Sequence, residues 1–290
     1  MSTEEVRPQP EAEPGPTVEP AREAAPEFAP QSASPPAIPS PPGPLPWRGR
    51  DLGFFIAFAA ATLVLANFLA LAAYALLRPL MGWHMSAQDA ASNPIFLVVT
   101  QSLYYGLLMA YIYVLVAVHY DLHFWKGLGW RSPTPRSALR FMMAGVVLGF
   151  IIARAPNLLP ERQNFPLEEL FNSPQGAYAV AIFAIVAAPL VEEIIFRGVL
   201  FAFFERLVGL RFAITATALL FAGLHVPEYW GAWNHVFLIL VVAFALSLAR
   251  GLTGSLASSI LLHFSYNFSL MIALFLSSQH FRSIHGLLLR

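Results

Sequence analysis

The chain has 290 residues, of which 57% are hydrophobic and 12% are charged, and its formal net charge at pH 7 is zero. Soluble globular proteins carry about one quarter charged residues, so this composition argues against a soluble fold. The absence of cysteine excludes disulfide bonds, thiol catalysis and thiolate metal ligands. The balanced charge points to no particular partner, and no nucleic-acid partner is expected.

The first 46 residues differ from the rest of the chain. They are rich in Pro, Ala, Glu and Ser, and Phe28 is their only aromatic residue. Such a segment cannot bury enough apolar surface to offset the entropy lost on ordering. We therefore predict a disordered tail over residues 1–46, followed by a multi-helical membrane domain over residues 47–290.

Apolar stretches fill most of the remaining sequence, and several reach the ~20 residues that a helix needs to cross a bilayer. We predict an all-α polytopic membrane protein with about seven transmembrane helices. The predicted stretches are 51–77, 95–119, 137–155, 177–204, 211–226, 235–249 and 256–278.

Basic residues near the ends of the stretches predict the orientation of the chain. They are more numerous on the side that holds the N-terminus, which favours a cytoplasmic N-terminus. The composition is poor in Lys and rich in Arg and Ala, which suggests a bacterium with a GC-rich genome. We expect a multi-pass protein of the bacterial inner (plasma) membrane.

The fourth stretch contains charges, in the segment "LVEEIIFRGVLF". A charge at the centre of a membrane helix costs ~2.5–3.5 kcal/mol and usually has a partner. Glu193 and Arg197 are four residues apart, so they share a helix face and can pair. Glu192 is rotated by ~100° from this face and is left as the candidate working carboxylate. Alternatively, all three residues form one buried structural cluster.

Polar residues also occur in the fifth and seventh stretches. "LLFAGLHVPEYW" carries His225 just before Pro227, which ends the helix. "SILLHFSYNFSL" carries His263 and Asn267 at positions i and i+4, on one face. Taken singly, these residues are explained as an interfacial histidine and as hydrogen bonds between helices. At 1.5 Å per residue, however, they lie at a membrane depth similar to that of Glu192, which predicts one shared site.

These residue types support hydrolysis of an amide without a covalent intermediate. A carboxylate backed by a histidine can activate water as a general base, and a second histidine with an asparagine can donate hydrogen bonds to the developing oxyanion. Glu192, His225 and His263 can instead hold Zn²⁺ with a water in the fourth position. No cofactor is therefore assigned, and zinc remains the alternative. The H-E-x-x-H motif of zincins is absent.

The segments "EEIIFR", "FAGLH" and "HFSYN" match the motifs E-E-x-x-x-R, F-x-x-x-H and H-x-x-x-N. In this order, on successive apolar stretches, they resemble the CPBP family of CAAX prenyl proteases type 2 and of bacteriocin-processing or bacteriocin-immunity proteins. The resemblance covers roughly residues 135–280. It implies a multi-helical membrane endopeptidase, and the family has been described both as metalloprotease and as metal-free glutamate protease.

The resemblance also implies roles for the motif residues. Glu192 corresponds to the catalytic carboxylate, and His225 to its partner in activating water. His263 and Asn267 correspond to the oxyanion side of the site. Glu193 and Arg197 correspond to residues that support it.

Characterised prenyl proteases of the family have eight spans, so an eighth helix is possible here. We place it as a short re-entrant or amphipathic helix around residues 160–172. The implied partners are membrane lipid and a peptide or membrane-protein substrate. Bacteria generally lack prenylated CAAX proteins, so CAAX-box processing in the strict sense is not assumed.

Two other functions fit the same residues. One is a non-catalytic membrane protein, such as a bacteriocin-immunity or scaffold protein that keeps the fold. The other is a transporter in which these side chains line a proton or solute path.

Overall fold

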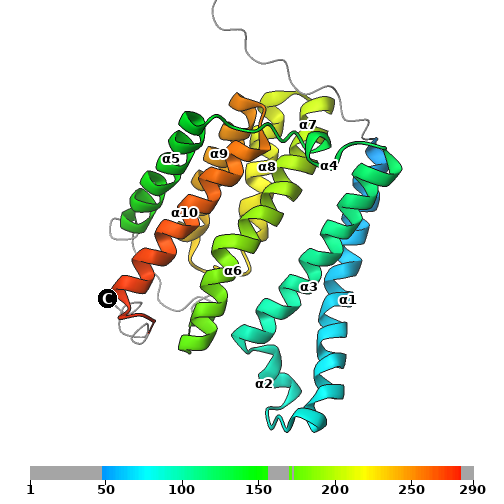
Figure 1. The fold of residues 1–290 in the computed structure, drawn as a ribbon, viewed down its shortest axis with the longest axis vertical. Coiled ribbons are helices and arrows are strands. Elements are labelled where there is room, and N and C mark those ends of the chain that lie inside the picture. The colour runs from blue at the N-terminus through cyan, green and yellow to red at the C-terminus, as the bar shows by residue number, and fades with distance from the viewer. Residues whose placement is uncertain (1–47, 156–169, 172, 282–290) are drawn as a thin grey trace, which may run out of the picture. The chain divides into compact units, whose positions relative to one another are not determined.

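A computed structural model describes residues 48–155, 170–171 and 173–281. Within these residues the regular structure is entirely helical, which confirms the predicted all-α class (Figure 1). The tail predicted for residues 1–46 lies outside the described residues. The extra helix predicted around 160–172 also lies outside them, except for residues 170–171.

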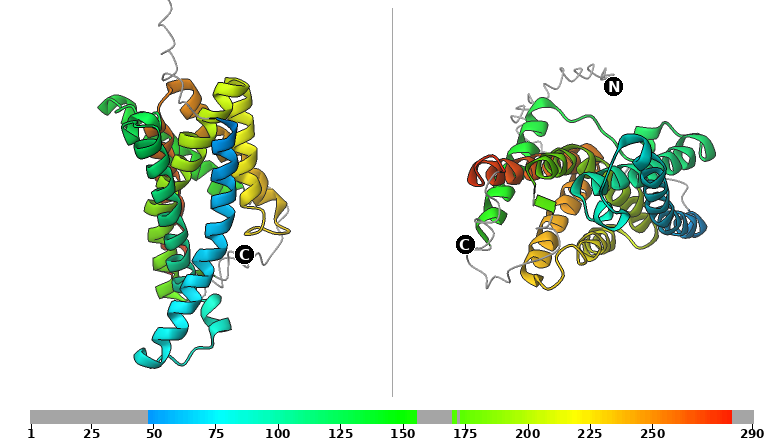
Figure 2. Two further views of the ribbon diagram at one scale, coloured as in Figure 1. Left: turned by 90° about the vertical axis from the view of Figure 1, so that its right-hand side faces the viewer. Right: turned by 90° about the horizontal axis from the view of Figure 1, so that it is seen from below.

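The helices follow the predicted apolar stretches closely. Figure 2 shows them from two further directions. They are α1 (Gly49–Met81), α3 (Pro94–Tyr113) continued by the π-helical η1 (Val114–His119), α5 (Pro135–Arg154), α6 (Pro174–Glu193) continued by the π-helical η4 (Ile194–Leu200) and by α7 (Phe201–Leu207), α8 (Leu210–Leu224), α9 (Trp233–Thr253) and α10 (Leu256–Ser277). Two short helices, α2 (Ala87–Ala91) and α4 (Phe124–Gly127), lie in connections.

Six helical segments in the described part of the chain are long and apolar enough to cross a membrane, so this is a multi-pass membrane protein. The remaining predicted stretch forms α8, which has 15 residues. At 1.5 Å per residue it measures about 22 Å, less than the ~30 Å of a bilayer's hydrocarbon core. This short helix accounts for the difference from the predicted seven.

Three of the long helices begin at the same kind of sequence. Asn93, Thr134 and Ser173 each accept a hydrogen bond from a backbone N–H of the first turn, and each is followed by proline. A capping side chain accepts a hydrogen bond from an N–H that has no partner within the helix. Proline at the first position sacrifices no helical hydrogen bond, because an N–H there would have no partner within the helix. These starts fix where α3, α5 and α6 begin.

Close packing of α5 against α10 helps to place the histidine-bearing helix. Gly145 and Gly149 of α5 form a G-x-x-x-G pattern, and a Cβ atom added to either would collide with the side chain of Ser265 or Ser269 on α10. Small residues at this spacing allow membrane helices to approach closely. Because α10 also packs against α6 and α9, it carries His263 towards the charged segment of α6.

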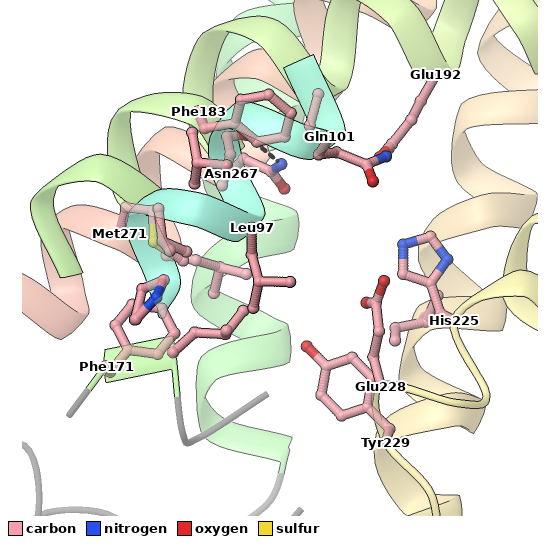
Figure 3. Close-up of a pocket in the computed structure, with 18 of the residues that line it drawn as sticks. Leu97, Gln101, Phe171, Phe183, Glu192, His225, Glu228, Tyr229, Asn267 and Met271 are labelled. Atoms are coloured by element: carbon pink, nitrogen blue, oxygen red, sulfur yellow. Dashed lines mark hydrogen bonds between the residues drawn. The ribbon is translucent and has the colours of Figure 1, made fainter. Parts of the chain in front are cut away.

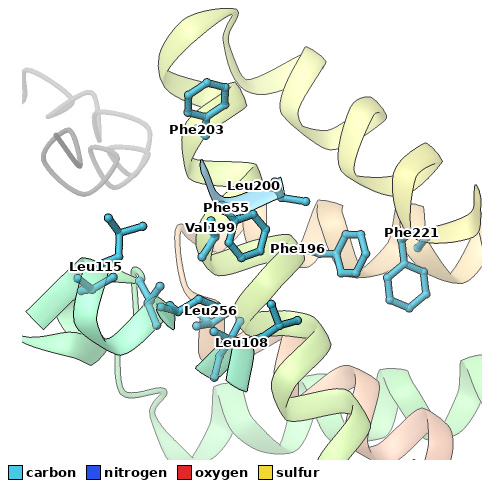
Figure 4. Close-up of a cluster of buried hydrophobic side chains, with 14 of the residues drawn as sticks. Phe55, Leu108, Leu115, Phe196, Val199, Leu200, Phe203, Phe221 and Leu256 are labelled. Atoms are coloured by element: carbon cyan, nitrogen blue, oxygen red, sulfur yellow. The ribbon is translucent and has the colours of Figure 1, made fainter. Parts of the chain in front are cut away.

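The main hydrophobic cluster surrounds η4 and joins it to α1, α3, α8 and α10 (Figure 4). Burial of these apolar side chains fixes η4, and with it the end of α6 that carries the two glutamates. The labelled members are Phe55, Leu108, Leu115, Phe196, Val199, Leu200, Phe203, Phe221 and Leu256.

Candidate active site

A buried ion pair lies at the junction of α6 and η4. The Arg197 guanidinium lies 2.9 Å from Oε1 of Glu193, and neither side chain is exposed to solvent. Arg197 also donates to the backbone carbonyl of Ala243 at 2.9 Å and to the Ser247 hydroxyl at 3.3 Å, both on α9. The pairing predicted from the i, i+4 spacing is present, and it links the charged segment to a neighbouring helix.

His263 lies between the two glutamates. Its Nδ1 is 2.9 Å from Oε1 of Glu193, and its Nε2 is 3.9 Å from Oε2 of Glu192. A carboxylate paired with Arg197 only accepts hydrogen bonds, so Nδ1 of His263 carries the hydrogen. In the neutral ring Nε2 is then an acceptor, and it donates only when the ring holds both protons.

Glu192 is largely buried, with 16% of its side chain exposed. Sequence spacing predicts that it points away from the Glu193–Arg197 pair, and in the structure it lines a cavity. It is not without partners, because the Tyr105 hydroxyl of α3 donates a hydrogen bond of 2.9 Å to its Oε1. Oε2 is the oxygen on the His263 side.

His225 follows the last residue of α8. Its Nδ1 lies 2.8 Å from the backbone carbonyl oxygen of Phe221, and its ring stacks on the Phe221 ring at a centroid distance of 4.6 Å. A carbonyl oxygen only accepts, so Nδ1 donates and Nε2 keeps its lone pair. The contacts thus fix both the orientation and the tautomer of the ring.

Asn267 lies one turn beyond His263 on α10. Its amide nitrogen donates to the backbone carbonyl of Ala184 on α6 at 2.7 Å. This is the hydrogen bond between helices that the structural interpretation predicts. The amide nitrogen has two N–H groups, so one such bond does not exhaust its donors.

One cavity of about 660 Å³ brings the predicted residues together. Glu192, His225, His263 and Asn267 all line it, which places residues of α6, the end of α8 and α10 around one space. Figure 3 shows His225, Glu228 and Tyr229 directed into this cavity, opposite Leu97 and Gln101 of α3.

The remaining wall of the cavity is mainly apolar. A cavity of this size with few polar groups is typical of sites that bind small molecules or short segments. Its apolar lining is suited to a hydrophobic stretch of a substrate. The larger apolar side chains that line it are Leu97, Val98, Phe171, Phe183, Leu270 and Met271.

Tyr105 and Glu228 are among the polar residues of the cavity that the sequence analysis did not identify. Tyr105 lies within the second apolar stretch. A hydroxyl at membrane depth needs a hydrogen-bond partner within the protein, and this need is the sequence signal that points to Tyr105. Glu228 lies three residues after His225, in the turn after α8, and no recognised motif includes it. Burial raises the pKa of the Glu228 carboxyl; His225 opposes this shift and the charge of Glu192 adds to it.

The arrangement does not fit the zinc centre that the sequence left open. No group of three or more His, Asp or Glu side chains gathers closely enough to hold a metal ion in the described ranges.

Fold and cavity together define a class: an all-helical, multi-pass membrane protein with a carboxylate–imidazole site among its helices. Residues 174–269 match the sequence model of a family described as type II CAAX prenyl endopeptidase, Rce1-like. The match confirms the family resemblance, and all three motifs lie inside it. The matched region runs from the start of α6 into α10. No curated protein and no solved structure matches the chain.

Proposed function

We propose that the protein is an intramembrane endopeptidase of the CAAX type, in which Glu192 and His225 activate the water that hydrolyses the peptide bond. The observation that carries this proposal is the convergence of the motif residues from three helical segments on one cavity. The family match over the same residues supports it.

In the proposed reaction, Oε2 of Glu192 and Nε2 of His225 are the acceptors for the water. As the water oxygen attacks the peptide carbonyl carbon, one of its protons passes to this pair. The C–N bond then breaks, and the proton moves to the departing amine. The second proton of the water stays on the new carboxyl group until it passes to the amine, so the products are a carboxylate and an ammonium group, and atoms and charges balance.

The developing oxyanion needs hydrogen-bond donors in the same cavity. Asn267 supplies an N–H that the bond to Ala184 does not use. His263 supplies Nε2–H when its ring carries both protons. The Glu193–Arg197 pair acts indirectly, because it holds the His263 ring through Nδ1.

The proposed partners follow from the cavity and its surroundings. The substrate is a peptide or a segment of a membrane protein, presented from membrane lipid against the apolar wall. The proposed location is the bacterial inner membrane, with the N-terminus in the cytoplasm. A prenyl group on the substrate is not part of the proposal.

The test uses the purified full chain in detergent, with a library of internally quenched membrane peptides that includes prenylated and unprenylated members. Glu192→Gln keeps the size of the side chain and removes its basicity, so we expect cleavage to fall roughly 10²–10⁴-fold. Glu205→Gln is the matched control, since Glu205 lies on α7 and is not among the residues that line the cavity.

Two results would count against the proposal. Wild-type protein that binds peptides of the library but cleaves none would favour the non-catalytic scaffold or immunity function. Transport of a solute by proteoliposomes, lost in Glu192→Gln, would favour the transporter.

Metal removal is a separate prediction. Because the donors described above do not gather as a metal centre, we expect an active preparation to keep its cleavage rate after dialysis against a chelator. The measurement is the rate before and after dialysis and after adding Zn²⁺. A complete loss that Zn²⁺ restores would contradict the metal-free mechanism.

A further inference from the structure

Tyr105 is a buried residue outside the region that matches the family. It belongs to α3, which packs against α6, and it is 9% exposed. Its ring stacks on Phe183 of α6, with centroids 5.7 Å apart and planes at 22°. This packing fixes the ring, and a fixed ring places its hydroxyl at one point relative to α6.

The hydroxyl of Tyr105 reaches the carboxylate of Glu192. It donates a hydrogen bond of 2.9 Å to Oε1. Hydrogen bonds to a charged group are stronger and more directional than those between neutral groups. With Oε1 held by Tyr105, the carboxylate is oriented so that Oε2 lies on the side of His263.

We propose that Tyr105 is a positioning residue for the peptidase reaction, holding Glu192 so that Oε2 is the oxygen presented to the water. This inference rests on the proposed function. It extends the site beyond the motif-bearing region to a helix that precedes it in the chain.

Loss of the Tyr105 hydroxyl should affect kcat and KM differently. Tyr105 acts through Glu192, so its loss leaves the apolar wall of the cavity intact and substrate binding nearly unchanged. The water is then activated by a carboxylate that is free to rotate, and a displacement of ~1 Å can cost about 100-fold in rate. The expected loss therefore appears in kcat and not in KM.

The experiment compares Tyr105→Phe with Tyr104→Phe, using the library peptide that wild-type protein cleaves fastest. Each change removes one oxygen atom. Tyr104 is the adjacent residue, partly buried against the main hydrophobic cluster, and its hydroxyl makes no hydrogen bond to any described residue. We expect Tyr105→Phe to lower kcat roughly 10–100-fold with KM within about 2-fold, and Tyr104→Phe to change neither.

A second measurement does not depend on activity. Thermal unfolding in detergent is compared for Tyr105→Phe in the wild-type chain and in a Glu192→Ala chain. If the hydroxyl contacts the carboxylate, the change lowers Tm by ~4 °C in the first background and by less than ~1 °C in the second.

The outcomes are distinguishable. An unchanged kcat in Tyr105→Phe, or equal Tm shifts in both backgrounds, overturns the positioning role. A raised KM with unchanged kcat also overturns it, because Tyr105 would then bind substrate. If Glu192→Gln keeps full activity while Tyr105→Phe loses it, the proposed function fails and the contact does not explain the loss.

Discussion

Arg197 is a fully buried guanidinium whose partners lie on two helices. Arg197→Leu would leave the Glu193 carboxylate buried beside His263 without its cation. Removing one partner of a buried ion pair costs ~3–5 kcal/mol, so we expect a large fall in the thermal stability of the detergent-solubilised protein. Arg211→Leu is the matched control, because Arg211 is exposed at the start of α8.

A further variant tests the reason for this loss. If the cost arises from the unpaired carboxylate, Glu193→Leu combined with Arg197→Leu should be more stable than Arg197→Leu alone. Equal stability of Arg197→Leu and Arg211→Leu would show that the pair contributes nothing to folding.

At the residue scale, a contact between neighbouring turns could be predicted from sequence spacing, whereas contacts between residues far apart in the chain could not. The i, i+4 rule predicted the Glu193–Arg197 pair, because both residues lie on one turn of one helix. The Tyr105–Glu192 bond joins residues 87 positions apart, and the His263–Glu193 bond joins residues 70 positions apart. Such contacts depend on how helices pack, which no single stretch of sequence contains.

The α5–α10 contact gives a prediction for a whole element. Gly149→Leu places a branched side chain where even a Cβ would meet Ser269. We expect a cost of ~1–3 kcal/mol from overpacking, seen as a lower midpoint of thermal unfolding, with cleavage falling alongside because α10 carries His263. Gly106→Leu is the control, since a Cβ at this α3 glycine meets nothing within 4 Å.

Equal midpoints for the two glycine variants would mean that α5 and α10 do not pack closely. A shift in Gly149→Leu alone would confirm the role of the small residues.

Helix boundaries were largely predictable because several starts have strong local causes. Asn93, Thr134 and Ser173 act as caps before proline, and these effects operate within one turn. The π-helical turns of η1 and η4 were not predicted. Each adds a residue to a turn, and nothing in the apolar sequence of these segments distinguishes that geometry from an α-helix.

At the scale of the whole molecule, the absence of cysteine allows a direct test of orientation. His84→Cys lies in the α1–α3 connection and Ser132→Cys in the connection before α5, and both positions are exposed. With a cytoplasmic N-terminus, a membrane-impermeant maleimide added to intact cells should label Cys at 84 and should label Cys at 132 only after permeabilisation. The reverse pattern would contradict the predicted orientation.

The sequence predicted a shared site because Glu192, His225 and His263 lie at a similar membrane depth. Counting residues along helices estimates depth, but it gives neither the rotation of a helix nor the path of a turn. For this reason Glu228, in the turn after α8, was not anticipated beside His225. The order of the three motifs nevertheless indicated the family whose sequence model matches residues 174–269.

The tautomers of the two histidines have a kinetic consequence. Both rings commit Nδ1 to an acceptor of the protein, and after hydrolysis the neutral His225 ring and Glu192 turn lone pairs towards the product. The peptide bond of the substrate can donate one N–H to these acceptor atoms, whereas the ammonium group of the new N-terminus can donate three. The product with this new N-terminus should therefore bind at the site more tightly than the uncleaved substrate. We therefore expect this product to inhibit the reaction by competing with the substrate for the cavity.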